Sequence, residues 1–187
     1  MIAKDLQSLS DPQQRKIKSL LWIFAFSLIL HNLEELITLV GFLNRHLVDF
    51  PAFFQPIAAL IQPAQYTLAI WMLNVLTLPL AWLAARRLQF ERTHQWISLF
   101  AVFMAINALS HLSQCLLFSS LAPGAVTAVL LILPISALLV RAEFQLGLLK
   151  KKQLILYPLL AILAMPLIVG LILGFSGWII SLANSLK

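Results

Sequence analysis

Apolar residues run along this chain in long stretches, separated by short polar connections. A helix needs about 20 apolar residues to cross the hydrocarbon core of a bilayer. Five stretches reach that length, approximately at 19–42, 66–85, 96–118, 124–149 and 154–182. The pattern predicts an all-α integral membrane bundle of five transmembrane helices, preceded by a polar N-terminal segment at 1–18 and followed by a tail at 183–187.

The connection at 47–65 is itself apolar, but Pro51, Pro56 and Pro63 interrupt it. Prolines at this density prevent a regular spanning helix, and irregular backbone facing lipid would leave its polar groups unsatisfied. We expect an interfacial or re-entrant segment on the outer face. It is either a lid over a site or a passive loop among the headgroups.

The last apolar stretch carries Gly170 and Gly174, four residues apart. This spacing permits two helices to approach closely. We expect it to serve packing inside the chain more readily than an oligomer interface, which it also permits.

The composition agrees with a membrane protein, since 61% of the 187 residues are apolar, 11% are charged, and the mean hydropathy is +0.93. A soluble domain carries roughly 25% charged residues, and a disordered chain needs low hydrophobicity with high charge. Both classes are therefore excluded.

The single cysteine, Cys115, cannot form a disulfide within the chain. We expect it to be a packing residue rather than a soft metal ligand.

The net charge of +6 reflects topology rather than a nucleic-acid partner, because the basic residues lie at the ends of apolar stretches and not on one soluble face. Eleven of the 13 Lys and Arg residues fall on the side of the N-terminus, and only Arg45 and Lys187 fall on the other. The positive-inside rule therefore predicts a multi-pass protein of the cell (inner) membrane, with a cytoplasmic N-terminus and an external C-terminus.

The first apolar stretch contains ionisable residues near its middle, His31, Glu34 and Glu35, with Thr38 one turn further on. Along a helix, Glu34 lies about 60° to one side of His31 and Glu35 about 40° to the other. All three therefore share one face. Two carboxylates at this depth need a proton, an imidazolium or a metal ion to compensate their charge.

Other apolar stretches bring polar residues to a similar depth. Asn107 and His111 lie one turn apart in the third stretch, and Asn74 lies in the second. The fourth stretch begins with Gly124 and has Thr127 in its first turn. The free N–H groups at this helix start could hold an anion or fix a loop.

Three motifs thus occur in order, His31-x-x-Glu34-Glu35, Asn107-Ala108-x-x-His111 and Pro123-Gly124-x-x-Thr127. The set resembles the HXXEE family of small membrane proteins, which is named for the first motif and marked by NAXXH and PGXXT. The resemblance covers the chain from the first to the fourth stretch. It implies a shared polar site more firmly than any particular reaction.

A bound metal ion is the leading hypothesis for this cluster, with His31, Glu35 and His111 as ligands. Glu34 would be a fourth ligand or the acid/base group, and Asn107 and Thr127 would orient ligands or substrate. Zinc would favour hydrolysis of an ester, amide or phosphoester in a lipid or other hydrophobic substrate, and iron would favour hydroxylation or desaturation. Desaturases and hydroxylases usually need more than two histidines, so zinc is favoured.

Three alternatives stay open. A metal-free site could isomerise an isoprenoid or sterol-like lipid by acid/base catalysis, resembling the emopamil-binding isomerases in its five spans although not in its motifs. The same residues could instead relay protons in a coupled transporter, or merely hold helices together.

The remaining ionisable residues are expected to be peripheral. We expect His46 and His94 to lie in solvated loops. Arg141 and Glu143 should form an interfacial pair near the inner end of the fourth stretch, and a second site there is the less favoured interpretation.

Overall fold

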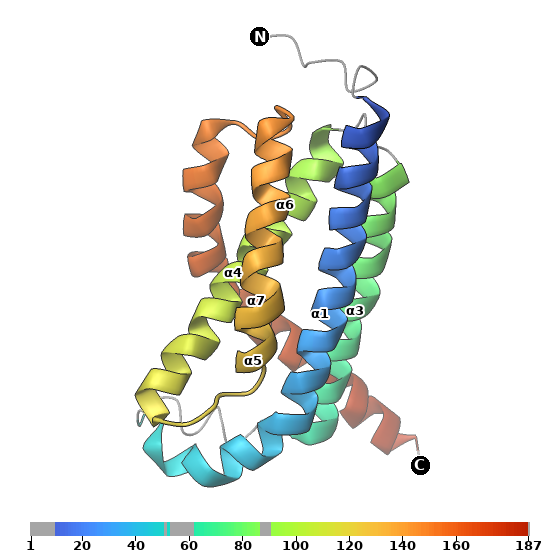
Figure 1. Cartoon of the computed structure of the whole chain (residues 1–187). Helices are drawn as coiled ribbons and strands as arrows, with labels where there is room; N and C mark the ends of the chain where they lie inside the picture. The colour runs from blue at the N-terminus through green and yellow to red at the C-terminus, as the bar shows by residue number, and fades with distance from the viewer. Residues whose placement is uncertain (1–9, 51, 53–61, 87–90, 187) are drawn as a thin grey trace.

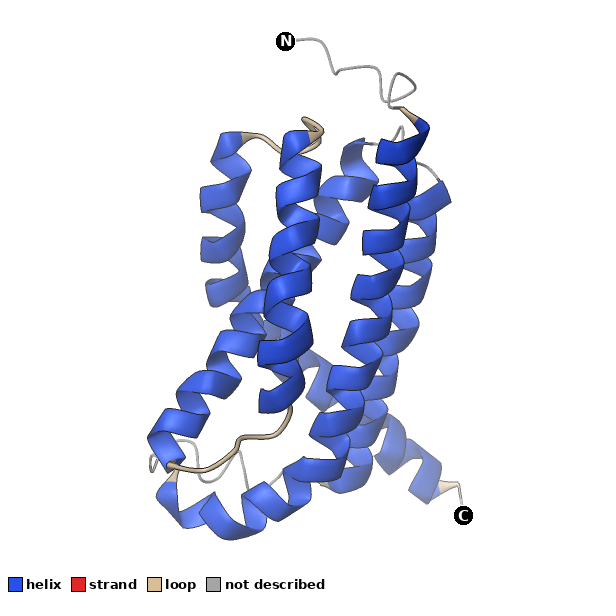
Figure 2. Cartoon of the chain, viewed as in Figure 1, coloured by secondary structure: helices blue, strands red, loops and turns tan. Residues whose placement is uncertain are grey.

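The computed structural model of this chain describes residues 10–50, 52, 62–86 and 91–186. Helices make up almost all of these residues, and no strand occurs among them (Figure 2). Five of the helical segments are long and apolar enough to cross a membrane. The all-helical fold with five candidate spans is therefore confirmed.

The five segments alternate in direction along the chain, so that odd and even connections lie at opposite ends of the bundle (Figure 1). The fourth segment begins with two short elements, the turn α5 and a π-helical turn η3, before it continues as α6. The helices are α1 (Asp11–His46), α3 (Pro63–Arg86), α4 (Glu91–Phe118), α5 (Ala125–Thr127), η3 (Ala128–Ile132), α6 (Leu133–Gln145) and α7 (Lys151–Ser185), and a 3-10 turn η2 (Leu47–Asp49) follows α1.

Several helices begin before the apolar stretch that predicted them. The first begins at Asp11 rather than at residue 19, because Pro12 suits a first helical turn and the Gln13 side chain accepts the backbone N–H of Ser10 at 3.1 Å. Its 36 residues make a helix about 54 Å long. Since the hydrocarbon core is only ~30 Å thick, polar turns extend α1 beyond the span. Residues 11–18 of the predicted N-terminal segment are thus helical.

The fourth span ends earlier than predicted, at Gln145 rather than at 149. Gly147 has a left-handed backbone (φ 76°), and its N–H donates to the Phe144 carbonyl while the Leu148 N–H donates to the Glu143 carbonyl, both at 3.0 Å. This pair of bonds is the Schellman arrangement that closes a helix C-terminus. Hydropathy did not reveal it because the following residues are also apolar.

Four of the spans close on one another, since α1 contacts α3 and α6, and α4 contacts the same two helices. The long helix α7 crosses the outside of this group obliquely and packs on α4 and α3 (Figure 1). It contains Pro158 and Pro166. One face of the four-helix group is thus covered by α7 where it crosses.

Two apolar clusters lie along the bundle axis, with a polar layer between them. The smaller one, at the end where α1 finishes, joins Phe42 to Phe118, whose ring centroids are 5.3 Å apart. The larger fills the half of the bundle in which α1 begins, and its largest members are Ile17, Leu21, Phe24, Leu28, Ile97, Met104, Ile132 and Leu139.

Gly170 and Gly174 do not mediate packing within the described part of the chain. A methyl group on either would meet nothing within 4 Å, so the favoured expectation of an internal contact was wrong. Gly177 makes the close approach instead, because a methyl there would lie 2.9 Å from the Gln65 amide nitrogen. A contact between two copies of the chain through Gly170 and Gly174 stays a prediction.

The predicted interfacial segment at 47–65 falls largely outside the described residues, which include only 47–50, 52 and 62–65 of it. Within them, η2 continues the chain beyond α1 and Pro63 begins α3. The lid and the passive loop both stay open as interpretations.

Candidate functional site

Helix α1 carries the centre of the polar layer. His31 and Glu35, one turn apart on the same face, are buried, with 0% and 7% of their surfaces exposed. Glu34 is only partly buried and points to a different neighbour. The two adjacent carboxylates therefore leave the helix about 100° apart, as helical geometry requires.

The Glu35 carboxylate joins three helical side chains. Its Oε1 atom lies 2.8 Å from Nε2 of His111 on α4 and 3.8 Å from Nε2 of His31. Its Oε2 atom accepts a hydrogen bond from the Tyr66 hydroxyl of α3 at 3.1 Å. The two imidazoles can compensate the negative charge of this buried carboxylate in two ways. One of them can be protonated to an imidazolium, or both can bind the same cation as the carboxylate.

The two imidazole rings face the same small volume. Their centroids are 5.1 Å apart and their planes cross at 70°. His31 Nε2 and His111 Nδ1 are buried without a hydrogen-bond partner among the described residues. One ligand atom from each of His31, Glu35 and His111 lies within 4.8 Å of the other two. The structure thus brings the predicted ligand triad together, as a group that could hold one metal ion.

Glu34 lies outside this triad and holds the start of α5. Its carboxylate accepts the backbone N–H groups of Val126 at 3.0 Å and Thr127 at 2.7 Å, and the Thr127 hydroxyl at 2.5 Å. The anion expected at this helix start is therefore Glu34 itself. The expected role of Glu34 as a fourth ligand finds no support in this geometry, because both of its oxygens bind the start of α5 and neither joins the cluster of ligand atoms from His31, Glu35 and His111.

Thr127 connects Glu34 to the triad, since its Oγ1 atom also lies 3.0 Å from His31 Nδ1. Metal-bound histidines are usually oriented by a hydrogen bond at their second ring nitrogen. Thr127 is placed to do this for His31, which agrees with the supporting role predicted for it.

Gly124 allows the chain to pass directly over the triad. Its backbone is left-handed (φ 72°), and a methyl group there would lie 2.7 Å from both Glu35 Cγ and His31 Cε1. Glycine is thus required twice, by backbone conformation and by the close approach to two site residues.

The other predicted supporting residues differ in their placement. The Asn107 side-chain nitrogen lies 3.0 Å from His111 Nε2, and Asn74 accepts a hydrogen bond from the Asn32 side chain at 2.6 Å, beside the site. Thr38 is the exception, because it is exposed and donates to the Glu34 carbonyl of its own helix. Its predicted role in the site was wrong, since one turn beyond Glu34 the helix face has already turned outward.

Tyr66 was missed by sequence reasoning. It stands at the predicted beginning of the second apolar stretch, where a tyrosine is readily explained as an interfacial residue. Tyr66 lies eight residues before Asn74, about two turns along one helix. This spacing is the sequence signal that could have placed Tyr66 near the site.

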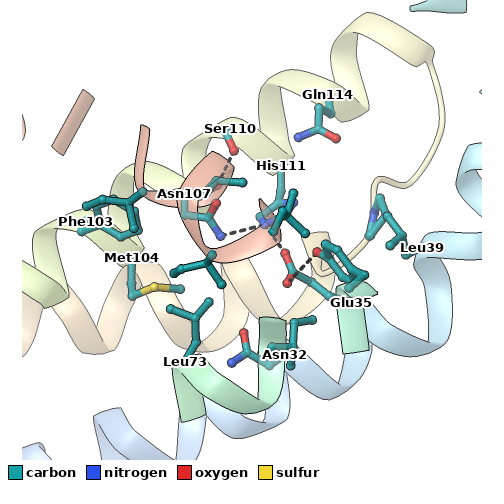
Figure 3. A pocket seen from close by; sticks show the side chains of 17 residues that line it. Asn32, Glu35, Leu39, Leu73, Phe103, Met104, Asn107, Ser110, His111 and Gln114 are labelled. Carbon is teal, nitrogen blue, oxygen red and sulfur yellow. Dashed lines mark hydrogen bonds and ion pairs between the residues drawn. The ribbon is translucent and has the colours of Figure 1, made fainter. Parts of the chain in front are cut away.

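A cavity of about 220 Å³ opens on Glu35 and His111. Figure 3 shows these two side chains turned toward each other, with Asn107 and Ser110 beside them and Leu73, Phe103 and Met104 along the apolar wall. Helix α7 contributes Ile168, Val169, Ile172 and Leu173. Two members of the triad, Glu35 and His111, therefore face a space that a small chemical group can occupy.

Cys115 is not part of the triad. Its sulfur accepts the Ala122 backbone N–H at 3.2 Å and it packs against the aromatic cluster around Phe42. This agrees with the expected packing role.

A second buried polar cluster lies toward the opposite end of the bundle and corrects two expectations. His94 and Glu143 are both 0% exposed; their Nδ1 and Oε1 atoms are 2.8 Å apart, and Ser98 donates to the second carboxylate oxygen. Arg141 is exposed. The expected Arg141–Glu143 interfacial pair and the solvated His94 were wrong, because α4 begins early enough to turn His94 toward α6.

His46 also differs from the solvated loop residue that was expected. It ends α1, is half-buried, lies 3.0 Å from an Asp49 carboxylate oxygen and packs on the Phe118 ring.

Replacing Gly124 should disturb the triad beyond the cost of its backbone conformation. Gly147 is the matched control, since it has a similar φ of 76° but open space around it. We expect Gly147→Ala to cost about 1–2 kcal/mol of stability and Gly124→Ala roughly a further 1–3 kcal/mol, because His31 and Glu35 must shift. Thermal unfolding in detergent measures both. Equal losses in the two variants would show that the close approach at Gly124 has no energetic consequence.

Comparison with known proteins gave one match. No curated protein and no solved structure matched the chain. The model of one family matches residues 22–139, a range that contains every residue from His31 to Thr127 described above. This range is more than half of the chain, so the chain belongs to the family described as proteins of unknown function with an HXXEE motif.

Proposed function

We propose that this HXXEE protein is a membrane-embedded, metal-dependent enzyme whose ion is held by His31, Glu35 and His111. The observation that supports it is the convergence of these three buried donors, from two helices, with Glu35 and His111 at the wall of a cavity. Buried ionisable groups at membrane depth are costly and are typical of functional sites.

Zinc is the favoured metal. Two imidazoles and one carboxylate form a set known for catalytic zinc and also for non-haem iron, and three protein ligands leave a position open for water or substrate. The described spans bring two histidines to this layer. That number suits a zinc hydrolase better than an iron desaturase or hydroxylase, which remains the second choice of chemistry.

The proposed reaction is hydrolysis of an ester or amide in a lipid or other hydrophobic substrate. The oxygen of an activated water bonds to the carbonyl carbon, the bond from that carbon to the leaving oxygen or nitrogen breaks, and a water proton passes to the leaving group. Glu35 Oε2, which accepts a hydrogen bond from Tyr66 and does not contact His111, is the carboxylate oxygen that would carry this proton. The Asn107 amide would orient the substrate carbonyl.

Glu34 acts in this proposal as a positioning residue. Its bonds to Val126 and Thr127 fix the start of α5, and Thr127 in turn orients His31. We therefore assign the acid/base role to Glu35 alone, rather than to Glu34 and Glu35 together.

A metal-free isomerase is the alternative, and the direct 2.8 Å contact between Glu35 and His111 favours it. In such a site a protonated Glu35 would donate its proton to a carbon–carbon double bond of an isoprenoid or sterol-like lipid. A histidine would withdraw a proton from a neighbouring carbon, so that the double bond shifts without net change.

The protein would lie in the cell (inner) membrane with its N-terminus in the cytoplasm. The basic residues support this orientation, because Arg15, Arg86, Arg92, Arg141 and Lys151 all lie toward the same end of the bundle (Figure 1). A lipid or hydrophobic small molecule would then reach the cavity from the bilayer.

Zinc binding should depend on the triad alone. We expect protein purified in detergent without chelators to hold about one zinc per chain, and His31→Ala, His111→Ala and Glu35→Gln to lose it. His46→Ala should keep it, because His46 is a half-buried histidine of the same helix outside the triad. Elemental analysis measures the zinc content, and circular dichroism checks that each variant is folded.

An absence of zinc and iron in the wild-type protein, even after incubation with either metal, would contradict the metalloenzyme and favour the isomerase. Equal metal content in His46→Ala and His111→Ala would show that the metal binds elsewhere.

The proposed orientation can be tested with single cysteines in a Cys115→Ser background. Gln145→Cys lies at the exposed end of α6 and Asn184→Cys at the exposed end of α7. A membrane-impermeant maleimide should label Asn184→Cys in intact cells and Gln145→Cys only after lysis. The reverse pattern would overturn the orientation.

A further inference from the structure

A second hollow adjoins the cavity of the proposed site. It has a volume of about 340 Å³ and lies between α3, α4 and α7. All its described lining residues are apolar, and they are Leu73, Leu80, Trp96, Leu99, Phe100, Phe103 and Ile168. We call it the apolar groove.

The apolar groove borders the polar cavity. Leu73 of α3, Phe103 of α4 and Ile168 of α7 line both spaces. The cavity alone, at about 220 Å³, is smaller than the roughly 300–1,000 Å³ of typical ligand pockets. The neighbouring apolar groove, at about 340 Å³, lies within that range, and the lining residues shared by the two spaces would let one ligand occupy both.

One face of α4 changes from apolar to polar at the junction. Trp96, Leu99, Phe100 and Phe103 precede the junction and Asn107 follows it, all at helical spacings that keep them on one face. The distance along the helix from Asn107 to Trp96 is about 16 Å. Trp96 itself is 64% exposed and is the lining residue of α4 farthest from Asn107.

The polar cavity favours an uncharged head group. Its polar lining consists of amides, hydroxyls, His111 and Glu35, without a lysine or arginine among the described lining residues. Apart from the proposed metal ion, a phosphate would find no lysine or arginine to pair with in this lining, whereas an ester, amide or alcohol finds donors and acceptors.

We propose that the substrate is a single-chain, uncharged amphiphile, an inference that rests on the proposed function and names its substrate class. Its head group lies beside Glu35 and His111, and its hydrocarbon chain follows the apolar groove along α4 to Trp96. The groove selects by shape rather than by hydrophobicity, because a chain leaving a bilayer gains little from another apolar environment.

A photoreactive amphiphile tests this placement. The probe is a long-chain primary amide with a diazirine at the far end of its chain, applied to the full protein in phosphatidylcholine vesicles. We expect cross-links, mapped by mass spectrometry, to peak at Trp96, Leu99 and Phe100. A short-chain amide with the same diazirine should label the region around Phe103 instead.

Two variants narrow the groove from opposite walls, Leu99→Trp on α4 and Leu80→Trp on α3. Each should reduce long-chain cross-linking about tenfold, because a tryptophan overfills the space. The matched control is Leu116→Trp, a lipid-facing position of the same helix that is 83% exposed, and it should leave labelling unchanged. Cross-links spread evenly over lipid-facing residues such as Leu116, or unaffected by both narrowing variants, would overturn the proposal.

Zinc content measured on the same samples separates the two proposals. Groove labelling in protein that binds no metal would support the amphiphile and contradict the metal site. Bound zinc without groove labelling would contradict the amphiphile and leave the metal site standing.

Discussion

The adjacent carboxylates of Glu34 and Glu35 on α1 are the constraint around which this structure is organised. Neither can remain in an apolar layer without compensation, and helical geometry directs them to different neighbours. Glu34 holds the start of α5 through the N–H groups of Val126 and Thr127. Glu35 meets His111 of α4 and Tyr66 of α3. The two acids thereby connect the helices that surround the cavity.

These two connections also fix the positions of residues in the site. Thr127 binds both Glu34 and His31, so fixing the start of α5 also fixes one imidazole. Gly124 closes the chain over His31 and Glu35 with no room for a side chain. Apolar clusters lie along the bundle axis on both sides of this layer. A preorganised polar centre between dry regions is the arrangement that strengthens electrostatic catalysis.

The number of spans was predictable because apolar length is a direct physical requirement of the bilayer. The helix bounds were less predictable. Polar turns at Asp11 and Glu91 extend two helices beyond their apolar stretches, and Gly147 ends a third helix inside its apolar stretch. The triad could be predicted from depth and helical spacing alone. The division of roles between Glu34 and Glu35 could not, because it depends on which helix lies on each side of α1. The pairing of His94 with Glu143, 49 residues apart, depends on tertiary structure in the same way.

The central claim is that His31, Glu35 and His111 bind one zinc ion. X-ray absorption at the zinc edge of the purified protein tests it most directly, because the first coordination shell reports the ligand types. We expect two imidazole nitrogens and carboxylate or water oxygens at about 2.0–2.2 Å, without sulfur. A shell containing the sulfur of Cys115, or a zinc edge unchanged in His31→Ala and His111→Ala, would contradict it.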